Sequence, residues 1–165
     1  MELPRARACR FTREAREKRE FWEEIDEENP GLSYACGCYL ISVRNRLWYV
    51  GLAQKQSFRY ECFTPDKILK IEDAMDGGGG AAYLTLIARQ TGNGRFSRPS
   101  INGYRDIKDL ELLLIGSALE RNDELLNRSA TKILREIVVP GFLNSPHGCG
   151  NDTSVKAFRQ IMGIW

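Results

Sequence analysis

Two short runs of strand-forming residues, 38–43 and 47–52, are separated only by Arg44-Asn45-Arg46. Apolar runs of this length around a short polar break are typical of an antiparallel hairpin. Each run carries a tyrosine, Tyr39 in the first and Tyr49 in the second, so the two phenols can lie near each other across the sheet. The sequence therefore predicts an antiparallel pair of strands at the centre of the fold.

The rest of the chain alternates between helical and extended patterns. A third strand is predicted over 81–90 from the alternation of its side chains. Helices are predicted over 12–28, where a charged amphipathic pattern ends at Asn29-Pro30-Gly31, over 64–75, over 107–121, after Ser129 and at the C-terminal end. These elements predict a single α/β (α+β) domain, a small mixed or antiparallel three-stranded sheet flanked by helices. We expect an N-terminal helical extension over 1–34, a core over 35–128 and a helical extension packed on the core over 129–165.

Four consecutive glycines, Gly77 to Gly80, follow the predicted helix over 64–75. A glycine-rich phosphate cradle needs a following Lys-Ser or Lys-Thr, and none is present. We therefore expect the glycines to form a flexible joint.

The 165 residues carry 24 basic and 22 acidic side chains, which excludes a generally basic nucleic-acid binder. The balance is uneven along the chain, with 11 basic against 7 acidic residues over 35–110. Residues 77–105 contain four arginines and no acid, a local field that attracts phosphate. No apolar run is long enough to span a membrane, and arginines occupy the N-terminus in place of a signal peptide, so we expect a cytoplasmic protein with no membrane partner.

The five cysteines are odd in number and irregularly spaced, which favours reduced thiols over a disulfide framework. Cys36 and Cys38 lack the spacing and the further ligands of a zinc site, so we expect both to be small buried strand residues. His147, the only histidine, is expected at the surface.

Glu111 lies within the apolar run Leu110 to Ile115. Burying a charge without a partner is costly. Its position indicates a metal ion, a buried basic partner such as Lys108 or Arg59, or a polar stripe on an otherwise buried helix.

The combination of motifs resembles the GIY-YIG nuclease family. The resemblance is carried by Gly37-Cys38-Tyr39-Leu40-Ile41, Tyr49-Val50-Gly51-Leu52-Ala53, Arg59, Glu111 and Leu126-Asn127, and it covers roughly residues 35–128. The family implies a metal-dependent endonuclease that hydrolyses the phosphodiester bonds of DNA with Mg²⁺ or Mn²⁺.

Carried over to this chain, the resemblance gives each motif residue a role. Glu111 would bind the metal, Tyr49 would help activate the attacking water and Tyr39 would orient water or phosphate. Arg59 would balance the charge developing on the phosphate, as a permanently charged planar fork is suited to do. Asn127 would support the site from beyond the glutamate helix.

Three positions depart from the family pattern. Leu52 stands where many members have a lysine, a contact that is lost unless Lys55 replaces it. Phe63 stands where a histidine or tyrosine is common, and the step from Glu111 to Asn127 is about one helical turn longer than usual. These departures favour an alternative, a catalytically weakened module that only binds DNA or another protein.

Outside the motifs, Lys55, Arg89, Arg95 and Arg98 are predicted to contact double-stranded DNA. Arg95 and Arg98 flank Phe96 in a loop that is either a solvated hairpin tip or a phosphate-tracking, base-stacking surface. A third interpretation treats the N-terminal helix as a partner-binding or dimer-forming arm.

Overall fold

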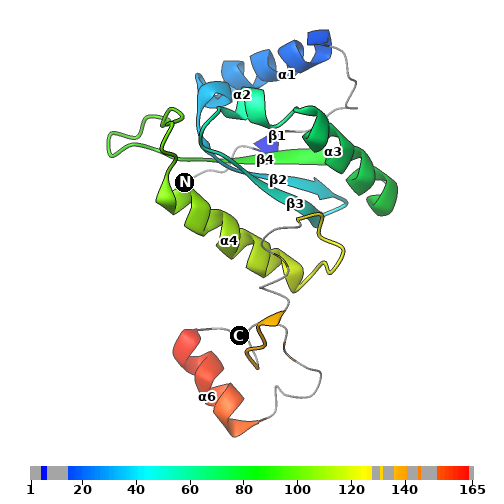
Figure 1. Cartoon of the computed structure of the whole chain (residues 1–165), viewed down its shortest axis with the longest axis vertical. Coiled ribbons are helices and arrows are strands. Elements are labelled where there is room, and N and C mark those ends of the chain that lie inside the picture. Colours follow the sequence, from blue (N-terminus) through cyan, green and yellow to red (C-terminus); the bar gives the residue numbers. More distant parts are fainter. Residues whose placement is uncertain are drawn as a thin grey trace.

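The computed structural model describes residues 5–6, 15–127, 131, 136–140, 145 and 152–163, and within them an α+β fold (Figure 1). The predicted fold class is confirmed. The elements in chain order are β1 (Arg5–Ala6), α1 (Ala15–Glu28), the 3₁₀ helix η1 (Leu32–Tyr34), β2 (Gly37–Val43), β3 (Arg46–Ala53), α2 (Phe58–Glu61), α3 (Pro65–Gly78), β4 (Ala82–Ala88), α4 (Arg105–Leu119) and α6 (Thr153–Met162).

The sheet is antiparallel with the strand order β1-β4-β2-β3, so β2 lies between β3 and β4. The predicted hairpin is confirmed, but its turn is one residue tighter, because Arg46 already belongs to β3. Arg44 and Asn45 both adopt positive φ angles, 47° and 63°, which is the backbone that two-residue hairpin turns require. The two-residue strand β1, which pairs with β4, was not predicted.

Helices cover both faces of the sheet (Figure 1). α1, α2 and α3 pack on one face, where Tyr39, Ile41 and Val43 of β2 belong to the main apolar cluster. α4 packs on the other face, where Ile107 contacts Cys38 and where Ile115 and Ala118 contact Val50. Two buried faces explain why the strands read as nearly continuous apolar runs.

Helix α1 contributes to this core. Trp22 is 1% exposed, and its ring packs against Phe21 and against Phe63, whose centroid is 5.4 Å away. The predicted end at Asn29-Pro30-Gly31 is confirmed, since the helix ends at Glu28 and Gly31 adopts a φ of 85°. The apolar face of α1 is thus used within the domain, and whether the helix also forms a dimer contact stays a prediction.

The glycine run is a packing device, which corrects its prediction as a flexible joint. α3 continues through Gly77 and Gly78, and only Gly79, with a φ of 61°, ends it. A Cβ on Gly77 would lie 2.5 Å from the Trp48 ring, and one on Gly78 would lie 2.6 Å from Val43 Cγ1. The absence of side chains therefore lets the last turn of α3 approach the hairpin closely.

Much of the C-terminal third lies outside the described residues, including most of the helix predicted after Ser129 and His147. Helix α6 is described, with Asp152 accepting a hydrogen bond from Ser154 N at its start and Gly163 ending it. The packing of 129–165 on the core stays a prediction. Among the described residues, no helix is both long enough and apolar enough to cross a membrane.

Gly78→Ala should destabilise the fold, because Val43 is a stiff, fully buried β-branched residue that cannot move away from an added methyl group. We expect a loss of about 1–3 kcal/mol in the free energy of unfolding, measured by urea denaturation. The matched control is Gly116→Ala in α4, where an added Cβ meets nothing within 4 Å. That variant should gain about 0.5–1 kcal/mol, and equal effects at the two glycines would contradict the packing role.

Candidate active site

The predicted tyrosine pair is formed. Tyr39 of β2 lies opposite Gly51 of β3, Ile41 lies opposite Tyr49, and the two phenol rings are 6.1 Å apart between centroids. A Cβ on Gly51 would collide with the Tyr39 ring and hydroxyl, so the glycine of Tyr49-Val50-Gly51 makes room for the phenol of the neighbouring strand. The spacing of the two motifs thus has a direct packing consequence.

Tyr39 lies in the core. Its side chain is 0% exposed, and its hydroxyl has no hydrogen-bond partner within the part of the chain that the structure describes. Burial, together with the nearby Cys62, Tyr49 and Glu61, raises the pKa of Tyr39 far above its ordinary value. Tyr39 therefore remains a neutral phenol, able to donate a hydrogen bond and unable to act as a base.

Two lysines from the start of α3 approach Tyr49 on the same face. Lys67 Nζ is 5.4 Å and Lys70 Nζ is 5.3 Å from the centre of the Tyr49 ring. Both lysines also contact Asp66, and Lys67 lies 4.0 Å from Glu61. The sequence motifs do not include these two lysines. The helix start at Thr64-Pro65 places them in the first two turns of α3, but nothing in the local pattern indicates that these turns face Tyr49.

Lys67 is largely buried, with 15% of its side chain exposed. Burial acts against its charged form, but the bond to Asp66 and the adjacent Tyr49 phenol outweigh burial, so the pKa of Lys67 is raised. A permanent ammonium group thus lies beside the tyrosine pair. Lys55, the residue considered as the replacement for Leu52, is exposed, and Leu52 itself packs in the apolar cluster under α4.

Arg59 lies on α2, next to the buried Phe58 that anchors this short helix. Its guanidinium carbon is 5.5 Å from the centre of the Tyr34 ring. Arg59 forms no ion pair with Glu61, the acidic residue two positions further along α2, and Glu61 pairs with Lys67 instead. Arg59 therefore keeps its charge available at the surface of the same helix whose end contacts Tyr39.

Glu111 lies on α4, on the face of the sheet opposite to the tyrosine pair. Its side chain is half-buried, and it has no hydrogen bond or ion pair with Lys108, Arg59 or any other described residue. Burial raises the pKa of Glu111, and the fields of Lys67 and Lys108 act in the opposite direction. Of the three alternatives, the direct basic partner is thus not found. The field of Lys67 is the link between Glu111 and the tyrosine face.

A partnerless, half-buried carboxylate is suited to a divalent cation. No cluster of three or more histidine, cysteine or acidic side chains suited to a metal exists among the described residues. A metal at Glu111 would thus take one protein carboxylate, with water and substrate oxygens as its other ligands. Mg²⁺ is commonly bound in this way, through one or two carboxylates plus phosphate oxygens.

Asn127 stabilises the edge of β3. Its amide nitrogen donates to Val50 O at 2.6 Å, and its carbonyl oxygen accepts from Val50 N at 2.9 Å. Leu126 N donates to Trp48 O, and the Asn122 side chain donates to Leu47 O, so residues 122–127 run along β3 like an additional strand. This course along the edge accounts for the long step from Glu111 to Asn127, and Asn127 fixes the backbone between Tyr49 and Gly51.

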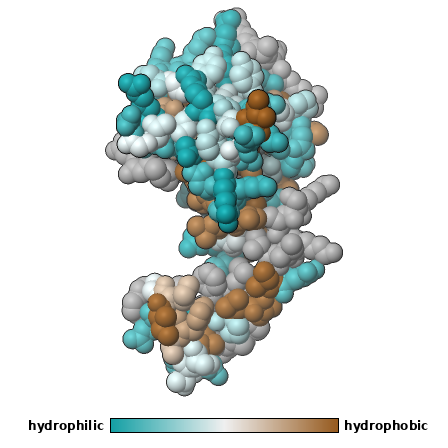
Figure 2. All heavy atoms as spheres, turned by 60° about the vertical axis from the view of Figure 1, so that its left-hand side comes forward, coloured by the Kyte–Doolittle hydropathy of each residue, from teal (hydrophilic) through white to brown (hydrophobic). Residues whose placement is uncertain are grey.

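The arginine loop after β4 is a small hairpin. Gln90 pairs with Phe96, and Gly94 turns the chain with a φ of 73°. Arg95 and Arg98 are exposed, and Figure 2 shows hydrophilic side chains mixed with side chains of intermediate hydropathy on the upper part of this face. Arg89 differs, because its guanidinium bonds to Asp106 at 2.8 Å and to Ser97 at 2.9 Å, so it joins the loop to α4.

The described cysteines are free thiols in buried positions. Cys38 Sγ bonds to Ile107 O, and burial raises the pKa of the Cys38 thiol to about 12. A thiol that stays protonated is a poor metal ligand. Cys36 and Cys38 are both buried as expected, but only Cys38 belongs to a strand, since Cys36 directly precedes β2.

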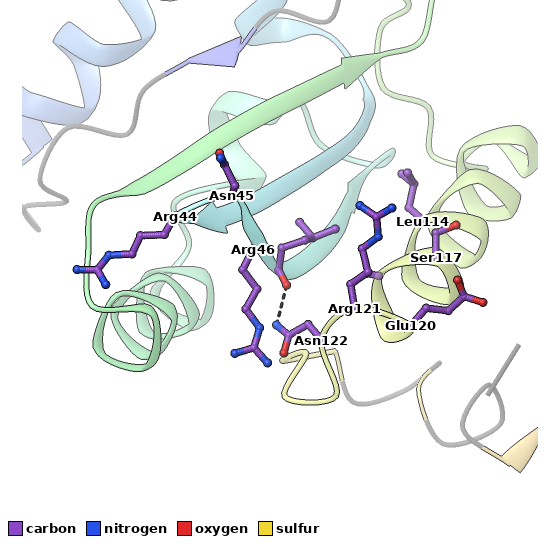
Figure 3. A pocket seen from close by; sticks show the side chains of 10 residues that line it. Arg44, Asn45, Arg46, Leu114, Ser117, Glu120, Arg121 and Asn122 are labelled. Atoms are coloured by element: carbon purple, nitrogen blue, oxygen red, sulfur yellow. Dashed lines mark hydrogen bonds between the residues drawn. The ribbon is translucent and has the colours of Figure 1, made fainter. Parts of the chain in front are cut away.

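A separate cavity of about 470 Å³ lies beyond the hairpin turn, at the C-terminal end of α4 (Figure 3). Arg46, Arg121 and Ser117 are among its lining residues. Arg46 is paired with Asp123 and Glu124, and in Figure 3 Arg44 points away from Arg46 and Arg121. The cavity includes none of the predicted catalytic residues.

Comparison with protein-family models, with curated proteins and with solved structures gave no significant match.

The raised pKa of Glu111 predicts a pH-dependent stability effect. The folded state holds the Glu111 proton more tightly than the unfolded chain, so the ionised side chain destabilises the fold above its ordinary pKa of 4.5. Glu111→Gln should therefore be more stable than wild type at pH 7 without divalent ions, and the difference should vanish below about pH 4. Thermal unfolding at both pH values checks this. A stability difference between the variant and wild type that is the same at both pH values would show that folding does not raise the pKa of Glu111.

Proposed function

We propose that this chain is a divalent-metal-dependent DNA endonuclease with a GIY-YIG-like site. The observation that carries the proposal is Glu111, a half-buried carboxylate on α4 without any hydrogen bond or ion pair among the described residues. An ionised group held in this way lowers stability, which is typical of sites that bind a cation. Its position after the third strand of the sheet matches that of the family's metal ligand.

Each step of phosphodiester hydrolysis has a candidate residue. Glu111 would hold Mg²⁺ or Mn²⁺, which when bound would neutralise phosphate charge and stabilise the leaving oxygen. Arg59 would contact the phosphate oxygens through its planar fork. Tyr49 would accept or relay the proton of the attacking water, and Asn127 would hold the Tyr49-Val50-Gly51 backbone in place.

Lys67 supports this assignment of Tyr49. Its ammonium lies at the Tyr49 ring and is within the field of Glu111, so it can stabilise negative charge that develops on the phenol oxygen. The contact sought at Leu52 or Lys55 would thus come from the first turn of α3. Tyr39, a neutral donor behind Tyr49, would orient the second phenol rather than meet the phosphate itself.

The burial of Tyr39 favours a second candidate function, a DNA-binding or assembly module without turnover. A hydroxyl that is 0% exposed cannot reach a phosphate unless the hairpin face opens. Phe63, in place of the common histidine or tyrosine, packs against Phe21 and Trp22 in the core. This module would keep the arginine surface and lose the need for Glu111.

The two candidates differ in their dependence on Glu111. For the nuclease, Mn²⁺ should raise the melting temperature of wild type, and supercoiled plasmid should be cut only with a divalent ion present. Glu111→Ala should abolish both effects and keep the fold, while Glu120→Gln, an exposed carboxylate at the end of the same helix, should keep both. Plasmid cleavage by Glu111→Ala, or by wild type in excess chelator, would exclude the mechanism.

Arg59→Ala should lower the single-turnover cleavage rate by about 10²–10³, the loss expected for one donor to transition-state charge. The side chain is only partly buried and makes no ion pair with any described residue, so the free energy of unfolding should change little. Arg19→Ala, on α1, is the control for a surface arginine. A cleavage rate equal to that of the control would remove Arg59 from the site.

A further inference from the structure

Two arginines from distant parts of the chain meet at one exposed aromatic ring. The guanidinium carbons of Arg59, on α2, and Arg98, in the loop after β4, each lie 5.5 Å from the centre of the Tyr34 ring. Tyr34 ends η1 and is 38% exposed. A cation within about 6 Å of an aromatic face is attracted to the ring. We call Tyr34, Arg59 and Arg98 the Tyr34 clamp.

The backbone around Tyr34 fixes this arrangement. Phe58 N donates to Ala35 O at 3.1 Å, which joins the start of α2 to the residue after Tyr34. Cys36 N donates to Ser97 O at 3.0 Å, which joins the next residue to the arginine loop. The two residues that follow Tyr34 thus each hold one of the arginine-bearing segments. The clamp is therefore built into the fold.

Neither arginine of the clamp has a carboxylate partner in the part of the chain that the structure describes. Arg89, by contrast, is paired with Asp106, and Arg46 with Asp123 and Glu124. Two like charges at one ring repel each other, and an anion between them removes that repulsion. The clamp therefore presents two free planar forks, the geometry that binds phosphate oxygens in pairs.

We infer that the Tyr34 clamp binds the phosphate backbone of duplex DNA next to the scissile phosphate. The inference rests on the proposed function, because Arg59 is at once a member of the clamp and the predicted catalytic arginine. Arg98 grips the neighbouring phosphate, and Tyr34 is a positioning residue that holds both guanidinium groups. DNA fits better than an acidic peptide, since the loop that carries Arg98, residues 90–104, holds a second exposed arginine, Arg95, and no acidic residue that could pair with a peptide's lysines.

The test uses the full chain and a labelled 20-base-pair duplex, with binding measured by fluorescence anisotropy in chelator over a salt series. Tyr34→Leu removes the ring and should weaken binding about 5- to 30-fold, from the loss of two exposed cation–π contacts. Tyr34→Phe keeps the ring and should restore most of that loss. Tyr60→Leu is the matched control, an aromatic on α2 that is 62% exposed and lies outside the clamp.

Arg98→Gln tests the phosphate contact itself. It should reduce the slope of log K against log salt by about 0.9, the value for one phosphate contact on duplex DNA. In the Arg98→Gln background, Tyr34→Leu should weaken binding less than it does in wild type, because one of its two partners is gone. The single variant Arg98→Gln replaces an exposed side chain, so its salt slope remains informative if Tyr34→Leu unfolds the protein.

An unchanged salt slope in Arg98→Gln, or equal binding by Tyr34→Leu and Tyr34→Phe, would overturn the clamp. A loss in Tyr60→Leu as large as that in Tyr34→Leu would do the same. Since binding is read in chelator, these outcomes are independent of cleavage. A protein that binds through the clamp and cuts nothing would refute the endonuclease and support the clamp.

Discussion

The phenol of Tyr39 lies across Gly51 of the neighbouring strand, and much of the molecule depends on this contact. It favours this register of β2 and β3, because a shift of either strand by one residue would turn the tyrosine of that strand to the α4 face. It also places Tyr49 where Lys67 and Lys70, in the first two turns of α3, reach its ring. The close approach of α3 depends in turn on Gly77 and Gly78, which leave room for Trp48 and Val43.

Lys67 and Glu111, two parts of the candidate site, approach each other around the β3 edge of the sheet. β1 pairs with the outer side of β4, and β2 lies between β4 and β3. β3 is therefore an edge strand, and side chains of α3 and α4, on opposite faces of the sheet, can approach each other past it. Residues 122–127 cover part of that edge through Asn122, Leu126 and Asn127. Lys67 on one face and Glu111 on the other act on each other around it. A substrate phosphate that meets both would have to lie along this edge.

The sequence predicts what is local and misses what is brought together by packing. The hairpin, the third strand and the start of α3 follow from alternation, turn residues and the Thr64-Pro65-Asp66 pattern, all of which act over a few residues. The sequence predicts that α3 ends before the glycines, because glycine usually ends a helix. The helix instead continues through Gly78, where the proximity of Val43 leaves no room for a side chain. Lys67 and Tyr34 were missed for the same reason, since their partners are 18 and 25 or more residues away in the chain.

The features that support function are those that do not help stability. A buried hydroxyl without a partner costs about 1–3 kcal/mol relative to a paired one, and Tyr39 carries such a hydroxyl at the centre of the core. Phenylalanine would fill the same space above Gly51 without that loss. Glu111 lacks a partner although Lys108 lies one turn before it, and the clamp holds two unpaired guanidinium groups at one ring. Glu111 and the two clamp arginines are thus charges without an ion-pair partner among the described residues, which is typical of groups that bind an ion of opposite charge.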